Sequence, residues 1–90
     1  MSDPRRLLRP RTRPTDEAEP GEATVIINPG ESGAQTFFLP VGAVEPEMLA
    51  STLLKQGLRD YPLPIREVKI RLPDGTICEM NARGIRRTFR

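Results

Sequence analysis

The sequence predicts a small α+β domain, in which one helix packs against one face of an antiparallel sheet in the order strand, strand, helix, strand, strand (ββαββ). Three observations support this prediction. The turn sequence Pro73-Asp74-Gly75 separates two segments in which apolar and polar residues alternate. β-Branched residues cluster at 24–28, and apolar residues recur at helical spacing after Pro46. Two pairs of strands around one helix are typical of a two-layer α+β domain.

The second hairpin is expected to span residues 65–82. Proline presets the first turn position and glycine accepts a left-handed third position, so Pro73-Asp74-Gly75 suits a three-residue loop closed by a glycine bulge. A two-residue loop at Asp74-Gly75 would set Ile70 against Glu79 and mix the core and solvent faces, which disfavours it. The expected pairs are Leu72 with Thr76, Ile70 with Cys78, Val68 with Met80, and Arg66 with Ala82.

The first hairpin is expected to join residues 24–28 to residues 35–39. Its first strand is β-branched and ends at Pro29-Gly30, which is typical of a strand followed by a turn. The register of this hairpin stays open, because either Phe37 or Phe38 suits the core face.

The helix is expected to begin at Pro46 and to end near Gln56. Proline is favoured at the first helical position, and Gly57 is a typical C-terminal cap. One stripe at helical spacing would face the sheet; it consists of Leu49, Ala50, Leu53 and Leu54.

The expected domain boundaries are residues 1–22 for an extended or disordered arm followed by an acidic linker, 23–82 for a single domain, and 83–90 for a basic tail. Charge is segregated along the chain, although the net charge is only +2. Five arginines precede Pro14, and no lysine or arginine occurs between Pro14 and Leu54. The prolines of the arm favour an extended, polyproline-like conformation over a continuous helix. Both a disordered tail and a docking arm fit this pattern.

The candidate partner-binding residues are the arginines of the two ends and an apolar pair in the arm. Arginine binds carboxylate and phosphate groups bidentately, whereas two adjacent leucines need an apolar groove. The set is Arg5, Arg6, Leu7, Leu8, Arg9, Arg11, Arg13, Arg83, Arg86, Arg87 and Arg90.

The composition favours a protein that is not an enzyme and that needs no cofactor or metal. The chain has no histidine, which removes the commonest general base and metal ligand. Its one cysteine, Cys78, is expected on the inward face of the second hairpin. No apolar run is long enough to span a membrane, so we expect no membrane contact and a cytoplasmic location, or a virion if the protein comes from a phage.

These features favour a small accessory or structural subunit of a larger bacterial or phage assembly, docked to a protein partner through its arm and basic ends. Self-association into a homo-oligomer is a related possibility. One alternative is a nonspecific nucleic-acid-associated protein that contacts phosphates through its arginine-rich tails. Another is a β-grasp-like binding module, which has the same element order. The sequence identifies neither the partner nor the stoichiometry.

Overall fold

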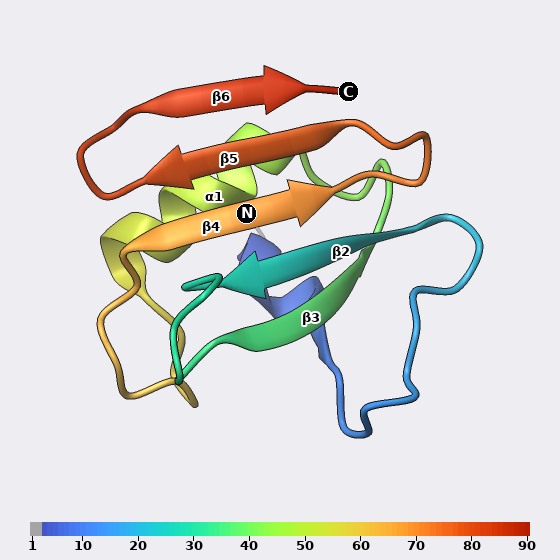
Figure 1. The fold of residues 1–90 in the computed structure, drawn as a ribbon, viewed down its shortest axis with the longest axis horizontal. Coiled ribbons are helices and arrows are strands. Elements are labelled where there is room, and N and C mark those ends of the chain that lie inside the picture. The colour runs from blue at the N-terminus through green and yellow to red at the C-terminus, as the bar shows by residue number, and fades with distance from the viewer. Residues whose placement is uncertain (1–2) are drawn as a thin grey trace.

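Residues 3–90 of the computed structural model form one six-stranded antiparallel sheet with one α-helix against one face (Figure 1). The sheet order is β1-β3-β2-β4-β5-β6. This arrangement confirms the α+β class, and the central strands and helix follow the expected ββαββ order. The elements are the 3₁₀ helix η1 (Pro4–Leu7), β1 (Arg9–Pro10), β2 (Glu22–Ile27), β3 (Gln35–Pro40), α1 (Pro46–Gln56), β4 (Glu67–Arg71), β5 (Ile77–Asn81) and β6 (Arg86–Phe89).

The β4–β5 hairpin has the predicted register. Ile70 pairs with Cys78, and Val68 pairs with Met80. The Leu72 N–H donates to the Thr76 carbonyl at 2.8 Å, which closes the three-residue loop, and Gly75 has the expected left-handed φ of 93°. The local chemistry of the turn therefore determines the register of this hairpin.

The sheet continues beyond Ala82, where the sequence analysis placed the start of a basic tail. The Asn81 N–H donates to the Ile85 carbonyl at 3.1 Å, and the Gly84 N–H donates back to the Asn81 carbonyl at 3.0 Å. These bonds repeat the geometry of the preceding loop, and Gly84 likewise has a left-handed φ, of 86°. The turn returns the chain alongside β5, so that residues 86–89 form an edge strand instead of a tail.

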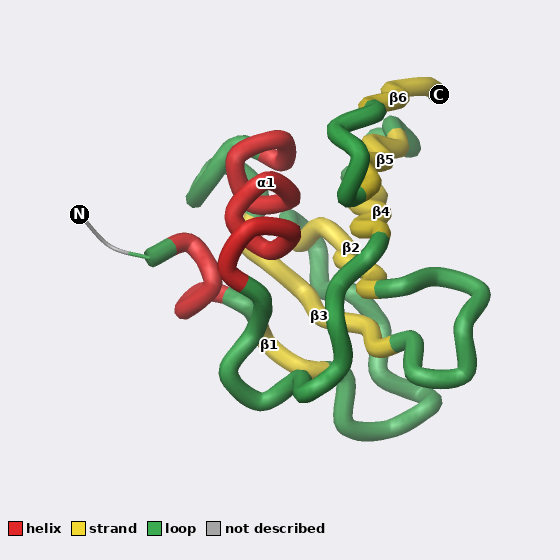
Figure 2. The backbone as a smooth tube through the Cα atoms, turned by 90° about the vertical axis from the view of Figure 1, so that its left-hand side faces the viewer, coloured by secondary structure: helices red, strands yellow, loops and turns green. Residues whose placement is uncertain are grey.

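The N-terminal arm lies against the body instead of extending freely. The Asp3 side chain caps η1 by accepting a hydrogen bond from the Arg5 N–H at 3.0 Å. Proline is tolerated in the first turn of a helix, where its missing N–H costs no hydrogen bond. β1 then pairs with β3 through Arg9 and Phe38. Figure 2 shows η1 next to α1, on the helix side of the sheet.

The core lies between α1 and the sheet. Val25 and Ile70 from the strands and Leu49 and Leu53 from the helix are at most 1% exposed. Helix α1 ends as predicted at Gln56, where the Gly57 N–H donates to the Leu53 carbonyl at 2.8 Å. These side chains place the helix over one sheet face and leave the other face uncovered.

The register of the first hairpin, open at the level of sequence, sends the two phenylalanines to opposite faces. Phe37 pairs with Val25 on the helix side and packs against the core. Phe38 pairs with Thr24 on the other face, where the Arg9 guanidinium lies 4.7 Å from the centre of its ring. Phe38 is therefore buried although no helix covers that face.

Buried Asn28 joins the end of β2 to the connector between α1 and β4. Its Nδ2 donates to the Tyr61 hydroxyl at 3.0 Å and to the Pro64 carbonyl at 2.9 Å. Its Oδ1 accepts from the Arg66 N–H at 2.7 Å and from the Glu67 N–H at 3.2 Å. Asn28 also has a left-handed φ of 51°, a conformation that asparagine tolerates better than most residues. This network fixes the connector between α1 and β4.

The sheet order bears on the β-grasp alternative. In a β-grasp sheet the first and last strands are parallel neighbours, whereas here β2 lies between β3 and β4 and every pairing is antiparallel. The topology therefore does not support that alternative.

Within residues 3–90, no helix is long and apolar enough to cross a membrane. The expected cytoplasmic or virion location and the bacterial or phage origin stay predictions.

Candidate functional site

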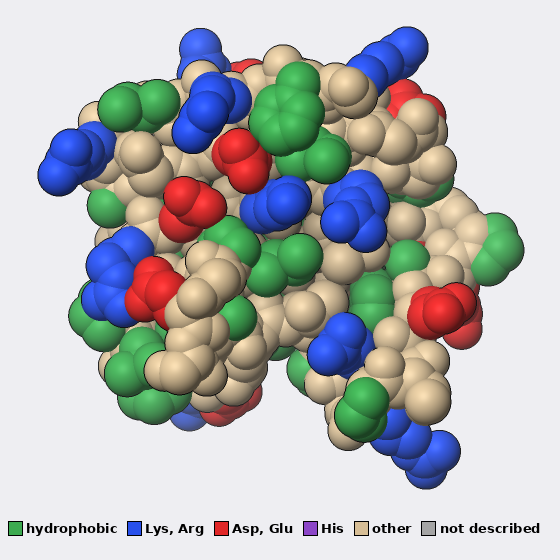
Figure 3. Space-filling view, in the orientation of Figure 1, with side chains coloured by type: hydrophobic (Ala, Val, Ile, Leu, Met, Phe, Trp, Pro, Cys, Tyr) green, Lys and Arg blue, Asp and Glu red, His purple; other side chains and the backbone are tan. Residues whose placement is uncertain are grey.

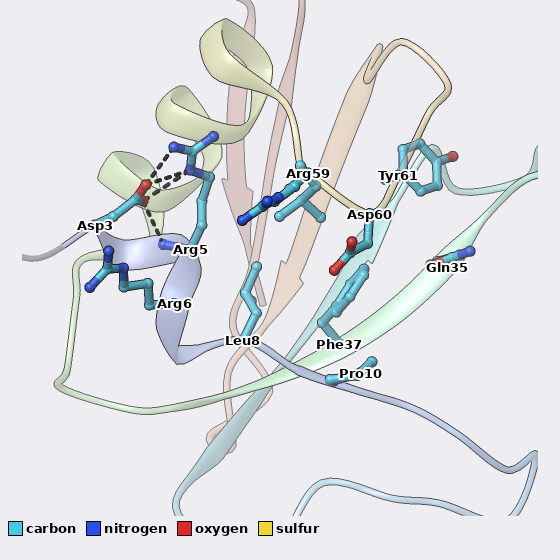
Figure 4. Close-up of a pocket in the computed structure, with 11 residues that line it drawn as sticks. Asp3, Arg5, Arg6, Leu8, Pro10, Gln35, Phe37, Arg59, Asp60 and Tyr61 are labelled. Atoms are coloured by element: carbon cyan, nitrogen blue, oxygen red, sulfur yellow. Dashed lines mark hydrogen bonds and ion pairs between the residues drawn. The ribbon is translucent and has the colours of Figure 1, made fainter.

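A cavity of about 460 Å³ opens between the N-terminal arm and the body (Figure 4). We call it the arm groove. Its walls come from η1 and β1, from the start of β3, and from the segment that follows α1. The volume lies within the roughly 300–1,000 Å³ typical of ligand pockets. The apolar side chains that line it are Leu8, Pro10, Phe37, Leu58 and Tyr61, and the polar ones are Asp3, Arg5, Arg6, Gln35, Arg59 and Asp60.

Arg5 fastens the arm to the C-terminal end of α1. Its Nη1 donates to the Gly57 carbonyl at 2.9 Å, and its Nε donates to Asp3 Oδ1 at 2.9 Å. The last carbonyls of a helix lack partners and form the negative end of the helix dipole, so a cation is favourable there. The hydrogen bonds from Arg5 lower the pKa of Asp3 from 3.8 to about 2. Arg5 thus acts as a structural clamp between the arm and the helix.

Arg9 holds the other end of the arm. It forms an ion pair with Glu22, with 2.6 Å between Nη2 and Oε1, and it covers the Phe38 ring on the open face of the sheet. The hydrogen bond from Arg9 lowers the pKa of Glu22. Both ends of the segment that roofs the groove are therefore attached to the body.

The body fixes the floor of the groove. The Tyr61 hydroxyl accepts from Asn28 and donates to the Gly33 carbonyl at 2.7 Å. Phe37 is held on the helix side by the β2–β3 register, and Leu58 bridges to Tyr61. A partner would therefore meet a preformed apolar surface.

The rim of the groove carries both charges, because exposed Asp60 follows Arg59 there. Arg6 and Arg59 are exposed, and in the part of the chain that the structure describes neither forms an ion pair. Figure 4 shows Arg59 and Asp60 over Leu8 and Phe37. An apolar floor beneath two uncommitted guanidinium groups suits an apolar group that lies next to a carboxylate.

The structure separates the eleven predicted partner-binding residues into two groups at opposite edges of the sheet. In the arm, Arg5, Arg6 and Leu8 line the groove, and Leu7 is 43% exposed beside it. Arg9 pairs with Glu22, while Arg11 and Arg13 are exposed in the connection to β2.

At the C-terminal end, two of the four predicted arginines are engaged. Arg86 forms an ion pair with Glu47 of α1 at 2.6 Å, and Arg90 lies 3.6 Å from the Asp74 carboxylate. Arg83 and Arg87 are exposed, and within residues 3–90 neither forms an ion pair.

Sequence reasoning missed the groove residues Phe37, Leu58 and Arg59 as a site. The signal available was local: the sequence analysis identified Gly57 as the cap of the helix, and Leu58 is the apolar residue that follows it. It also missed Lys69 and Arg71, which lie with Arg87 on the open face of the sheet.

Comparison with known proteins gives no relative: no family model, curated protein or solved structure matches the chain.

Proposed function

We propose that this protein is a non-enzymatic docking subunit of a larger assembly, and that a segment of a partner protein binds in the arm groove. The observation that supports this most strongly is the groove itself, with its preformed apolar floor and two uncommitted arginines at its rim. The arm is held to the body by Arg5 and Arg9. The partner therefore docks beneath the arm, and the arm need not extend along its neighbour.

The groove favours a partner segment that presents an apolar side chain beside a carboxylate. Burying one leucine-sized side chain contributes about 1.5–3 kcal/mol. A carboxylate at Arg6 or Arg59 adds a charge-assisted hydrogen bond and fixes the orientation.

Exposed apolar side chains on the segments that border the groove favour a protein partner over a small molecule. Leu7 on η1 and Leu63 in the connector after Tyr61 are 43% and 48% exposed. Both belong to segments that border the groove. A small ligand would leave these side chains in water, whereas a protein surface would cover them.

Five carboxylates of the chain suit binding better than acid–base catalysis. Asp3, Asp16, Glu22, Glu31 and Asp74 all have a lowered pKa, caused chiefly by hydrogen bonds from arginine side chains or backbone N–H groups. A general acid needs the opposite shift, toward the working pH. These groups therefore act as permanent anions that hold loops and arginines in place.

Site-specific photo-cross-linking in the cells that make the protein tests this proposal. A photoreactive residue at Gln35, on the groove wall, should capture one partner protein, whereas the same residue at exposed Thr15 should not. Arg59→Glu should lower the cross-linking yield from position 35 roughly tenfold, which corresponds to a loss of ~1.4 kcal/mol in the binding free energy. The control Lys55→Glu makes the same charge change at the end of α1 and should leave the yield unchanged. Equal capture from Gln35 and Thr15 would contradict the proposal.

A nucleic-acid-associated role is a second candidate, favoured by the open face of the sheet. Cross-strand pairing places Arg71, Ile77 and Phe89 in one row, and Lys69, Glu79 and Arg87 in the next. Figure 3 shows this face, where acidic side chains lie among the basic ones. Cations beside an exposed ring are typical of surfaces that bind single strands without sequence preference. Phe89 is the one ring exposed on this face within residues 3–90, which limits stacking.

Titration with oligothymidylate at several salt concentrations tests this second candidate. Binding to this face should weaken linearly on a log–log plot against salt, and Lys69→Glu should weaken it further. An affinity that does not change with salt would exclude the open face as a phosphate-binding surface.

A further inference from the structure

Strand β6 is an unpaired edge of the sheet. It is the last strand in the order, and all four of its residues are exposed (Figure 1). An edge strand presents unpaired N–H and C=O groups that can accept another strand. The opposite edge, β1, is only two residues long and includes Pro10, so it offers fewer such groups.

The β5–β6 register identifies which backbone groups of β6 are open. The Asn81 N–H donates to the Ile85 carbonyl, so Asn81 and Ile85 form a hydrogen-bonded pair. Hydrogen-bonded pairs alternate along an antiparallel ladder, which directs the backbone groups of Arg87 and Phe89 toward β5. The N–H and C=O groups of Arg86 and Thr88 therefore point away from the sheet.

The charge around this edge discriminates between occupants. Residues 83–90 contain four arginines and no acid, but acids from other elements face three of them: Glu47 pairs with Arg86, Asp74 pairs with Arg90, and Glu79 is the cross-strand neighbour of Arg87. Within residues 3–90, Arg83 and Arg87 form no ion pair, so these two exposed cations are the ones open to a partner. Pairing of two β6 strands from two copies would place arginines beside arginines, so the charge opposes self-association at this edge.

We propose that the outer edge of β6 binds an extended acidic segment of a partner protein by strand addition. Backbone hydrogen bonds to Arg86 and Thr88 align the incoming strand, as in other cases of β-augmentation. Side chains two residues apart on that strand meet Arg87 and Phe89 on the open face. One of them is a carboxylate at Arg87 and the other is an apolar side chain at Phe89, which is 45% exposed.

The probe is a fluorescein-labelled peptide, Val-Thr-Glu-Thr-Glu, amidated at its C-terminus, and its binding to the full chain is measured by fluorescence anisotropy. Saturable binding is expected, and the peptide with lysine in place of each glutamate should bind at least roughly tenfold more weakly. Oligothymidylate serves as a competitor. Equal binding of the two peptides, or binding of oligothymidylate alone, would overturn the proposal.

Thr88→Pro tests the backbone contact directly. It removes an outward N–H and leaves the β5–β6 hydrogen bonds in place, because proline is tolerated at an edge where its nitrogen faces solvent. The variant should bind the acidic peptide roughly tenfold more weakly, whereas Thr88→Val, which keeps the N–H, should bind as the parent does. Unchanged binding by Thr88→Pro would contradict strand addition.

Amide exchange in the parent chain keeps the test independent of any variant's folding. The Arg86 and Thr88 amides should become protected when the peptide is added, and no protection there would overturn the proposal. The β6 edge and the arm groove lie at opposite edges of the sheet, so failure of peptide binding would leave the cross-linking result at Gln35 unaffected.

Discussion

Replacing Asn28 with alanine should remove much of the stability of the fold. The side chain is 1% exposed and makes four hydrogen bonds to residues 61–67, which form the connector between α1 and β4 and the start of β4. In Asn28→Ala, the Arg66 and Glu67 N–H groups and the Pro64 carbonyl lose their partners. The Tyr61 hydroxyl keeps its bond to Gly33.

The magnitude follows from these lost bonds and from the backbone conformation. An unsatisfied buried polar group costs about 1–3 kcal/mol, and the lower end applies here because the affected groups are only partly buried. Three such groups give about 3 kcal/mol. Alanine at a left-handed φ adds about 1 kcal/mol, for a total near 4 kcal/mol. A domain of this size has a total stability of only about 5–10 kcal/mol.

Urea unfolding monitored by circular dichroism measures this loss. Asn28→Gly relieves the backbone strain but loses the same bonds, so it should cost about 3 kcal/mol. Asn81→Ala is the matched control, because Asn81 also accepts two backbone hydrogen bonds but lies in a half-exposed turn; it should cost about 1 kcal/mol. If Asn28→Ala were no more destabilised than Asn81→Ala, the connecting role of Asn28 would be wrong.

Three further predictions concern the core, the last turn and the ion pairs. Leu53→Ala should lower the free energy of unfolding by about 2–5 kcal/mol in urea, because the side chain is fully buried between α1 and the sheet; a loss under about 1 kcal/mol would contradict that packing. Gly84→Ala should cost about 1–2 kcal/mol because φ is 86° there, and it should speed amide exchange in β6 first; exchange that stays at the parent rate would argue against the β5–β6 turn. The pKa of Asp3 is about 2 in the folded chain, below its ordinary 3.8. The ionised carboxylate therefore stabilises the fold fully above pH 3.8, and this stabilisation is lost as the pH falls through about 2. The melting temperature should therefore be flat near neutral pH and fall as the solution is acidified below about pH 4, less steeply in Asp3→Asn; identical acid profiles for parent and variant would show that Asp3 does not contribute to stability in acid.

The parts of the fold that depend on local chemistry were predictable from the sequence. The register of β4–β5 follows from Pro73-Asp74-Gly75, and the limits of α1 follow from Pro46 and Gly57. Each of these signals lies within a few residues of the feature that it determines, so no knowledge of distant contacts is needed.

The two edge strands were missed because their signals are weak or distant. Residues 86–89 lack an alternating apolar pattern, since β6 is exposed on both faces. Only Gly84 indicated the turn between β5 and β6. It is equivalent to Gly75 in the turn between β4 and β5, since both glycines have a left-handed φ. β1 and η1 depend on contacts with residues far along the chain, such as that of Arg5 with Gly57.

The arm groove was beyond sequence reasoning for the same reason. Leu8, Phe37 and Leu58 come from three separate segments and share no spacing that predicts a common surface. The choice between Phe37 and Phe38 likewise depends on the pairing of β3 with β2 and on the packing of Arg9 against the open face.

The central claim is that a partner protein docks beneath the N-terminal arm. Hydrogen–deuterium exchange of the chain alone and in complex with the partner captured at Gln35 tests it most directly. We predict slower exchange at residues 5–10 and 57–61, the segments that border the groove, when the partner is bound. Unchanged exchange in both segments, with protection confined to other parts of the sheet, would contradict the claim.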